Sequence, residues 1–395
     1  MSEKSFAVVG ISDSANPEFP SEVRKIIAGS RIFSGGRRHH EIVRHLLPPD
    51  HLWIDIEKKK KKVWDNYGPH REILIFASGD PLFYGFATTL QREFPNSSIA
   101  VYPAFNSLQI LSHRMLIPYA GMVNVSVTGR PWDGLDAAVI EQQELIGVLT
   151  DRKKGPIEIA SRLLEYGYDN YLMSVGENLG NEDLERIRTF PLEKVAEANF
   201  KHPNCVILQM THKRHKVFGI SEKDFFILNG REKMITKMPI RLLTLAMLDL
   251  HQRKTMWDIG FCTGSVSIEA KLRFPKLDII AFERRIESRE LLAKNCRKFG
   301  TPGIQGVIAD FFECDLSNFR RPDAVFIGGH GGRLVEMIKS VATVLNPGGV
   351  IVFNSVSPES CRLFETGATL AGLSRIESHD LTIDNHNTIK IMKAQ

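Results

Sequence analysis

The sequence predicts an α/β protein made of two α/β domains in one chain. Three observations lead to this class. At 395 residues the chain is longer than one ordinary domain, so two domains are expected. Hydrophobic residues make up 43% of it, which is enough for two cores. Apolar runs alternate with helical patterns along the chain, which indicates mainly parallel sheets covered by helices.

Residues 1–211 form the first predicted domain. The stretches 20–30, 83–94 and 157–167 carry apolar residues three and four positions apart, which predicts helices. Short apolar runs separate these stretches and predict strands. The predicted strands are 5–11, 72–78, 98–104, 124–129, 145–151, 171–178 and 204–210.

Residues 212–232 are charged and lack sustained periodicity, which predicts a linker. His212 and His215 lie in it among basic residues, without a carboxylate or third ligand nearby. We therefore interpret them as part of a solvated linker and not as a metal pair. The lysine run from Lys58 to Lys62 is interpreted as a solvated loop or helix face, with attraction of an anionic ligand as the alternative.

Residues 233–395 form the second predicted domain, in which the alternation restarts. The order of its elements indicates a doubly wound sheet, in which ligands bind outside the carboxyl ends of the strands. The predicted helices are 240–250, 265–274, 288–299 and 333–345, and the predicted strands are 255–260, 277–283, 306–310, 323–329 and 349–355.

The composition favours a cytoplasmic protein that binds neither membranes nor nucleic acid. The 51 basic and 46 acidic side chains give a net charge of +5, without the basic and aromatic clusters of nucleic-acid-binding proteins. The five cysteines are scattered at spacings unsuited to zinc, so we expect reduced thiols and no metal. The first apolar run is too short for a secretory signal, and no run of about eighteen apolar residues is present.

The stretch 256–272 runs from a strand through a glycine-bracketed turn into a helix. Gly260 ends the strand and Gly264 opens the helix. A dinucleotide-binding turn needs glycine where Cys262 and Ser265 stand, because a pyrophosphate approaches the bare backbone. Glu283 follows 23 positions after Gly260, where a carboxylate accepts hydrogen bonds from ribose hydroxyls. The expected ligand therefore has a ribose and no phosphates, and S-adenosylmethionine meets this description.

Two further strand ends favour a methyl donor at this edge of the sheet. Asp310 ends the third strand, where an acid can meet the amino group of adenine, and the glycines of 328–332 follow the fourth strand. Because the carboxyl ends of parallel strands share one edge, we expect these groups to surround the donor. A tight strand-helix turn with an exposed glutamate is the alternative.

The region from Lys233 to Lys393 resembles the decarboxylating methyltransferases of cobalamin biosynthesis that act at carbon 15 of a precorrin. The motifs that carry the resemblance are MITKMPIRLLTLAML, WDIGFCTGSVSIEA, AFERR, PDAVFIGGHGG and LNPGGVIVFNSVSPES. That family usually has glycine in place of Cys262, so the donor is expected to be slightly displaced. It commonly has a small residue in place of His330, which either contacts the substrate or fills space. The resemblance implies that S-adenosylmethionine is bordered by Thr236, Gly260, Phe261, Cys262, Thr263, Gly264, Glu283 and Phe311. Asp258 and Asp310 are further candidates for binding the donor.

The first domain resembles the tetrapyrrole methylase family, and within it the precorrin methylases that act at carbon 5. The motifs are ILIFASGDPLFYGFATTLQREF, YPAFNSLQ, VTGRP and SVGENLG. The resemblance implies two α/β subdomains with S-adenosylmethionine between them. Family members carry G-x-G-P-G after the first strand, whereas this chain has GISDSAN at Gly10–Asn16, which leaves turnover by this half open. The residues implied at the donor pocket are Gly79, Asp80, Pro81, Leu82, Phe83 and Thr150.

The order of the two halves resembles the C(5,15)-methyltransferases of precorrins. This implies a Rossmann-like class I fold for the second domain, a tetrapyrrole substrate methylated at carbons 5 and 15, and loss of the ring C acetate as carbon dioxide. Cationic groups must then anchor the substrate carboxylates, and Arg130, His330 and Arg333 are the candidates. We also expect a homo-oligomer and assign no nucleophilic residue. The alternatives are an RNA methyltransferase carried by the second domain, a nicotinamide-dependent reductase, and a protein whose first half is inactive.

Overall fold

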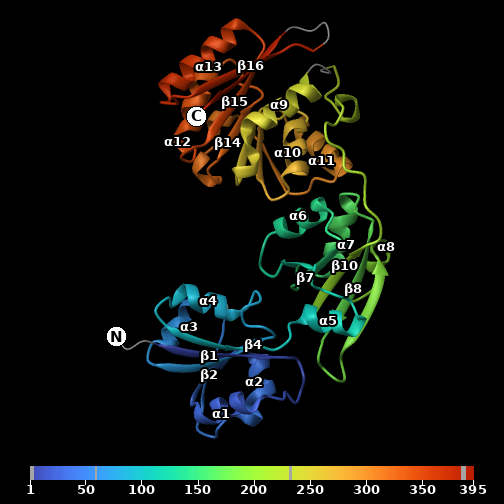
Figure 1. Cartoon of the computed structure of the whole chain (residues 1–395), viewed down its shortest axis with the longest axis vertical. Coiled ribbons are helices and arrows are strands. Elements are labelled where there is room, and N and C mark those ends of the chain that lie inside the picture. Colours follow the sequence, from blue (N-terminus) through green and yellow to red (C-terminus); the bar gives the residue numbers. More distant parts are fainter. Residues whose placement is uncertain (1–3, 58–59, 231–233, 384–387) are drawn as a thin grey trace. The chain divides into compact units, whose positions relative to one another are not determined.

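The computed structural model describes residues 4–57, 60–230, 234–383 and 388–395 (Figure 1). They form two compact units. The N-terminal unit contains the residues up to 130, 144–161 and 171–211, and the C-terminal unit contains 131–143, 162–170 and 212 onward. The predicted linker therefore falls in the C-terminal unit, and the functional division at residue 211 stays a prediction. Lys58 and Lys59 lie outside the described residues.

The first sheet of the N-terminal unit is parallel throughout, with the strand order β3-β2-β4-β1-β5 (blue to cyan in Figure 1). Its strands β1 and β4 have the predicted bounds. The strands are β1 Ser5–Ile11, β2 Ile32–Gly35, β3 Leu52–Asp55, β4 Glu72–Ser78 and β5 Ser98–Tyr102; the helices beside them are α1 Ser21–Gly29, α2 Arg37–Val43, η1 Arg44–Leu46, α3 Lys60–Tyr67 and α4 Phe86–Glu93.

The second sheet has the order β6-β7-β10-β8-β9 and is mostly antiparallel. The prediction of a mainly parallel sheet is wrong here. Both β7 and β8 run against β10, so they share a direction, as a strand-helix-strand unit requires, but β10 lies between them. A short connection makes β8 and β9 a hairpin. The elements are α5 Ser107–Met115, β6 Val123–Ser126, α6 Asp133–Glu141, β7 Leu145–Leu149, α7 Pro156–Glu165, β8 Tyr171–Glu177, β9 Arg186–Pro191, α8 Leu192–Val195 and β10 Asn204–Met210.

The C-terminal unit contains a seven-stranded sheet in the order β13-β12-β11-β14-β15-β17-β16. Its first five strands are parallel, and β17 pairs antiparallel with both β15 and β16. The elements are η2 Glu222–Asp224, α9 Met238–Leu248, η4 Leu250–Gln252, β11 Thr255–Ile259, α10 Ser265–Arg273, β12 Asp278–Glu283, α11 Glu287–Phe299, β13 Ile304–Ile308, η5 Phe311–Glu313, η6 Leu316–Asn318, β14 Ala324–Ile327, α12 Leu334–Val344, β15 Val350–Ser355, α13 Pro358–Leu370, β16 Ile376–Leu381 and β17 Ile389–Ala394.

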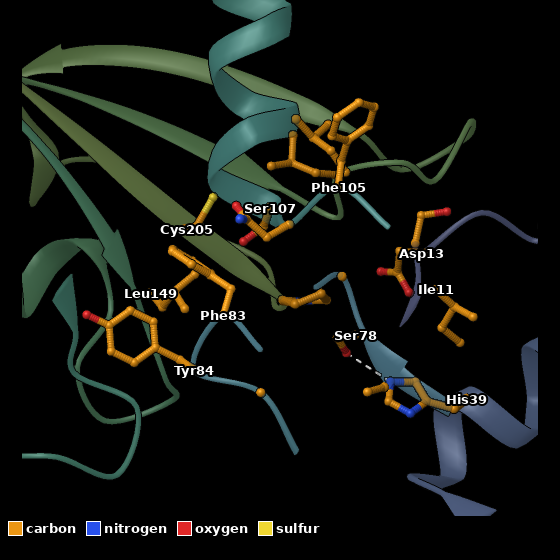
Figure 2. A pocket seen from close by; sticks show the side chains of 18 of the residues that line it. Ile11, Asp13, His39, Ser78, Phe83, Tyr84, Phe105, Ser107, Leu149 and Cys205 are labelled. Atoms are coloured by element: carbon orange, nitrogen blue, oxygen red, sulfur yellow. Dashed lines mark hydrogen bonds between the residues drawn. The ribbon is translucent and has the colours of Figure 1, made fainter. Parts of the chain in front are cut away.

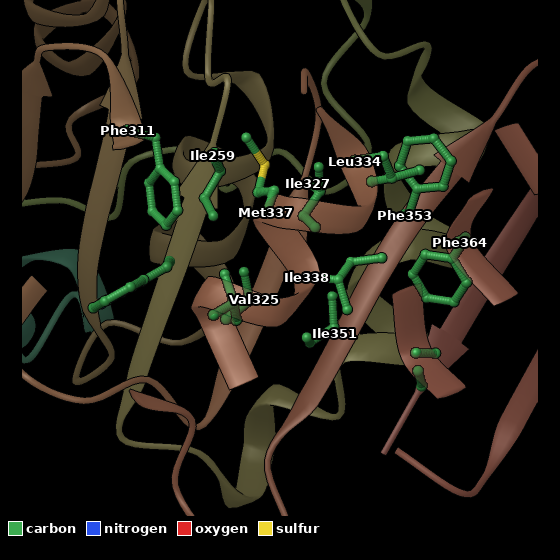
Figure 3. Close-up of a cluster of buried hydrophobic side chains, with 14 of the residues drawn as sticks. Ile259, Phe311, Val325, Ile327, Leu334, Met337, Ile338, Ile351, Phe353 and Phe364 are labelled. Atoms are coloured by element: carbon green, nitrogen blue, oxygen red, sulfur yellow. The ribbon is translucent and has the colours of Figure 1, made fainter. Parts of the chain in front are cut away.

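A buried hydrophobic core holds the strand ends of this sheet in place (Figure 3). Val325 and Ile327 alternate along β14 toward Ile338 of α12 and Phe364 of α13, and none of the four is exposed. Burying each such side chain stabilises the fold by about 1.5–3 kcal/mol. The core thereby fixes the loops that follow β11, β12 and β14. Among the described residues, no helix is both long and apolar enough to span a bilayer.

Candidate functional site

A cavity of about 180 Å³ opens at the carboxyl ends of β11, β12 and β14. Parallel strands of a doubly wound sheet bind ligands at this edge, so the cavity lies where the sequence places a ligand. We call it the second cavity. The predicted site residues that line it are Gly260, Cys262, Glu283, Asp310, Phe311, His330 and Arg333.

The turn after β11 comes into backbone contact with the turn after β14. Gly260 has a φ of 80°, and a Cβ on it would lie 2.5 Å from the amide nitrogen of Gly329. Only glycine fits this approach. Cys262 also has a positive φ, of 48°, so this cysteine adopts a backbone conformation that favours glycine.

Glu283, at the end of β12, is a buried carboxylate whose exposed fraction is 4%. Its Oε1 accepts hydrogen bonds from the amides of Arg284 and Arg285, at 2.9 and 3.1 Å, and from the Arg285 guanidinium at 3.0 Å. Its Oε2 accepts from the amide of Cys262 at 3.2 Å. Since a carboxylate oxygen has two lone pairs, Oε2 retains capacity for a ligand hydroxyl.

Asp258 lies on β11 below the turn, with an exposed fraction of 1%. Its Oδ2 accepts from the Ser267 hydroxyl at 2.6 Å, whereas its Oδ1 has no hydrogen-bond partner among the described residues. Burial raises the pKa of this carboxyl to about 6, and the Glu283 charge adds to the rise. The side chain points toward α10 and does not line the cavity.

The outer part of the second cavity is formed by the loops after β13 and β14. Asp310 accepts a hydrogen bond from the amide of Phe312 at 3.0 Å through Oδ1, and Phe311 packs edge-on against Phe282. His330 accepts from the amide of Gly332 through Nδ1 at 3.2 Å. Burial lowers the pKa of His330, so the imidazole is neutral, with its proton on Nε2.

The other residues predicted for this site surround the turn without lining the cavity. Phe261 packs in a cluster with Ile268 and Leu292. The carbonyl groups of Thr236 and Thr263 accept hydrogen bonds from Arg241 and Asn295, at 2.8 and 2.9 Å. Gly264 begins α10 with a φ of 77°. Their roles toward a ligand remain predictions.

A larger cavity, of about 420 Å³, lies in the N-terminal unit at the end of β4. We call it the first cavity. Figure 2 shows Phe83, Leu149 and Cys205 on one side of it and Ile11 and Asp13 on the other. Of the predicted donor residues, Gly79 and Phe83 line it.

Gly79 repeats in the first cavity the contact that Gly260 makes in the second. Its φ is 59°, and a Cβ on it would lie 2.8 Å from the Cα of Asn106. Gly10 packs from the other side, where a Cβ would meet the carbonyl oxygen of Gly79. The end of β4 is therefore closed on both sides by backbone.

The remaining residues predicted for the first domain lie near the cavity but do not line it. Asp80 accepts from the amide of Leu82 at 2.8 Å and so shapes the turn that also contains Pro81. The Thr150 hydroxyl donates to the side chain of Asn204 at 2.7 Å, and Asn204 does line the cavity. The guanidinium of Arg130 stacks on Tyr84, 4.7 Å from its ring centre.

Sequence reasoning missed His39, which lines the first cavity from α2. Its Nε2 lies 2.9 Å from the Ser78 hydroxyl, the contact drawn as a dashed line in Figure 2, and its Nδ1 lies 3.0 Å from the carbonyl oxygen of Phe76. Burial, aided by the Arg38 charge, lowers the pKa of His39 to about 4. The ring is neutral, and its Nδ1–H donates to Phe76 while Nε2 accepts from Ser78. A histidine after two arginines gives no sequence signal for this arrangement.

The loop that departs from the tetrapyrrole methylase pattern contributes to the first cavity. Ser12 and Asp13 line it. Asp13 forms an ion pair with Arg38 at 3.2 Å, and its carbonyl oxygen accepts from Asn181 at 3.4 Å. The loop is thus held by side chains in place of the glycines and proline of the usual motif.

Two family models match the chain in succession. Residues 6–196 match "Tetrapyrrole (Corrin/Porphyrin) Methylases", and residues 228–382 match "Precorrin methyltransferase domain". The chain is 29% identical over 379 residues to precorrin-6Y C(5,15)-methyltransferase [decarboxylating] from Sinorhizobium sp, covering 94% of this chain and 89% of that protein. It is 37% identical over 138 residues to cobalt-precorrin-6B C(15)-methyltransferase (decarboxylating) from Salmonella typhimurium, covering 35% of this chain and 70% of the relative.

The chain belongs to the precorrin-6Y C(5,15)-methyltransferase family. A third relative is the cobalt-precorrin-7 C(5)-methyltransferase of Salmonella typhimurium, 34% identical over 136 residues, with 34% of this chain and 65% of that protein covered. The resemblance inferred from the motifs is therefore confirmed for both halves. This is a family of S-adenosylmethionine-dependent methyltransferases. The residues that line the second cavity all lie in the second matched region, and those that line the first cavity lie in the first matched region except for Pro203, Asn204 and Cys205.

Proposed function

We propose that the chain methylates precorrin-6Y, or its cobalt analogue, at carbons 5 and 15 and removes the ring C acetate as carbon dioxide, in cobalamin biosynthesis. The observation that carries this proposal is the presence of two separate cavities, each at the end of a strand in a region that matches a different methyltransferase model. The first cavity serves carbon 5 and the second serves carbon 15. S-adenosylmethionine is the methyl donor in both.

The residues of the second cavity fit this donor. The buried Glu283 has room on Oε2 for a ribose hydroxyl, and Asp310, which lines the same cavity, is a candidate acceptor for the adenine amino group. The close approach of Gly260 to Gly329 leaves bare backbone beside the place of the methionine end. In the first cavity, Gly79 and Phe83 contact the donor. Thr150 does not line this cavity, but its hydroxyl holds the side chain of Asn204, which does.

The chemistry needs no protein nucleophile. When bound, the donor supplies an electrophilic methyl group: a bond forms between that methyl and a nucleophilic ring carbon as the carbon–sulfur bond breaks. The protein's part is to hold the two atoms in line in a dry cavity, which can supply roughly 7–11 kcal/mol. Phe311, Phe282 and Ile259 give the second cavity an apolar lining.

Decarboxylation depends on how the departing carboxylate is paired. Its carbon–carbon bond breaks with the electron pair entering the conjugated macrocycle, so a strongly paired carboxylate would resist the loss. The retained side-chain carboxylates have the opposite need and require cationic partners. The second cavity must therefore discriminate between carboxylates of one substrate.

The test is anaerobic incubation of the full chain with precorrin-6Y and methyl-labelled S-adenosylmethionine, followed by mass spectrometry. Two added methyl groups and one lost carboxyl are expected. A product with carbon 15 methylated and carbon 5 unchanged would show that the first half is inactive. A chain that leaves the precorrin unchanged but methylates RNA would overturn the proposal in favour of the RNA methyltransferase.

A further inference from the structure

Three arginines line the second cavity, and two of them are engaged by carboxylates of the chain. Arg285 pairs with Glu283 at 3.0 Å. Arg333 pairs with Glu336 at 2.6 Å, and its guanidinium lies 3.7 Å from the ring centre of Phe312. Glu336 therefore competes with a substrate carboxylate for Arg333, which is one of the three candidate anchors named from the sequence.

Arg284 differs from both. Its side chain is exposed, and within the described part of the chain its guanidinium forms no ion pair. Its backbone is fixed, because its amide donates to Oε1 of Glu283 at 2.9 Å. Its Nη1 lies 3.5 Å from where a Cβ on Gly331 would be. The side chain therefore reaches from the end of β12 to the glycine loop after β14, at the mouth of the cavity.

His330, the one residue with a side chain in the glycine loop 328–332, supplies a hydrogen-bond donor that carries no charge. His330 is neutral, because burial lowers its pKa and its Nδ1 accepts from Gly332. Its Nε2–H is left as a hydrogen-bond donor. Among the described residues that line the second cavity, Arg284 is thus the cation that remains available to an incoming anion.

We infer that Arg284 binds a carboxylate of the tetrapyrrole that is retained in the product and thereby orients the macrocycle for methylation at carbon 15. This inference rests on the proposed function. The bound carboxylate is a retained one because a guanidinium pair would stabilise the carboxylate that has to leave as carbon dioxide. Arg284 is therefore a substrate-positioning residue that distinguishes one carboxylate from another.

The test compares Arg284→Ala with Arg284→Lys in the full chain. Arg284→Ala should raise the KM for carbon 15 methylation about tenfold, because a charge-assisted contact to the substrate is lost. Donor affinity and the ratio of one carbon dioxide per carbon 15 methyl should stay unchanged. Arg284→Lys should recover part of the loss, since lysine keeps the charge but not the bidentate geometry.

The matched control is Arg289→Ala, which removes the same charge from an exposed position of α11 outside the cavity. It should leave the KM unchanged, and unchanged affinity for S-adenosylmethionine at the second cavity in each variant reports that the C-terminal unit is folded. An unchanged KM in Arg284→Ala would overturn the inference, as would an equal rise in Arg289→Ala. A changed ratio of carbon dioxide to methyl would also overturn it, because Arg284 would then pair with the departing carboxylate. Failure of the unmodified chain to methylate carbon 15 would instead reject the proposed function.

Discussion

The two cavities have the same kind of backbone contact and differ in the charge of the side chains that line them. Each lies at a strand end where a left-handed glycine, Gly79 or Gly260, touches the backbone of a neighbouring loop. The second cavity contains the buried acid Glu283 and three arginines. The first cavity is lined by the ion pair of Asp13 and Arg38 and by the neutral pair of His39 and Ser78.

This difference indicates two ways of holding one donor. A buried carboxylate recognises ribose hydroxyls through strong hydrogen bonds, so the second cavity depends on one side chain. Among the described residues no buried carboxylate lines the first cavity, so this cavity depends on the shape of its backbone turn. Single substitutions should therefore affect the two methylations unequally.

The largest effect is expected from Glu283→Ala. The substitution removes the acceptor for the ribose and leaves the amides of Cys262, Arg284 and Arg285 without their partner. Carbon 15 methylation should fall by at least about a hundredfold, as expected when two or more charge-assisted hydrogen bonds are lost. Carbon 5 methylation should persist. Mass spectrometry of the product after a fixed time measures both.

A second variant separates donor binding from folding. Glu283→Gln keeps the shape and one acceptor, so the turn should fold while donor affinity falls. Calorimetric titration of S-adenosylmethionine should then show one binding site where the unmodified chain shows two. Two sites of unchanged affinity would exclude Glu283 from the donor site.

A smaller loss is expected from Gly79→Ala, and it should affect carbon 5 methylation instead of carbon 15 methylation. Its Cβ would lie 2.8 Å from the Cα of Asn106, and its φ is unfavourable for alanine. The turn must shift, and a displacement of about 1 Å can reduce the rate by roughly a hundredfold. Carbon 5 methylation should fall by tenfold or more while carbon 15 methylation continues. Equal losses at both carbons would mean that the cavities do not work independently.

The second cavity was easier to predict from the sequence than the first. Gly260, Glu283 and Asp310 each end an apolar strand, and parallel strands bring their ends to one edge. The spacing along the chain therefore predicted their proximity, and the cavity unites them. The charged state of Asp258 was not predictable, because it depends on how completely α10 covers that side chain.

His39 was missed because the strand before it gives almost no signal. β2 has four residues, two of which are serine and glycine, so no sustained apolar run marks it. Pairing with β4 brings the start of α2 beside Ser78. The polar edge strand β16 and the sheet order β7-β10-β8 were missed for a related reason. Pairing partners depend on the whole sheet and not on local pattern.

The titration of His39 should make a measurable contribution to the pH dependence of the free energy of unfolding. Its pKa in the folded protein, about 4, lies below the usual 6.5, so the folded state favours the neutral ring. This stability is fully present above about pH 6.5 and is lost as the pH falls toward 4. The loss should be at most about 3 kcal/mol, at about 1.4 kcal/mol per pKa unit. In urea unfolding, His39→Gln should reduce the fall in unfolding free energy between about pH 6.5 and 4. An unaltered fall would contradict the lowered pKa of His39.

The contribution of Asp258 to stability should depend on pH in the opposite direction. Its pKa of about 6 lies above the usual 3.8, so the folded state holds the proton more tightly than the unfolded state. Stability from this group is therefore full below about pH 4 and declines as the pH rises through 6. Asp258→Asn should stabilise the protein by about 1 kcal/mol at pH 8, less than the pKa difference alone gives, because the new amide lacks a partner at the Oδ1 position. The gain should vanish at pH 4 in the same urea experiment; a gain independent of pH would be inconsistent with titration of Asp258.

The smallest effect is expected from Cys262→Gly, which tests the departure from the usual glycine of this family. The cysteine occupies a left-handed conformation with a φ of 48°, which costs a residue with a side chain about 1–2 kcal/mol. Glycine relieves that cost but loses about 0.5–1 kcal/mol through the greater freedom of the unfolded chain. The net gain in unfolding free energy should therefore be below about 1 kcal/mol. Donor affinity at the second cavity should stay the same or rise, since the Glu283 contact is made by the backbone amide of residue 262 and not by its side chain. A marked fall in that affinity would show that the thiol itself contacts the donor, and the two cavities would then differ in a side-chain contact as well as in charge.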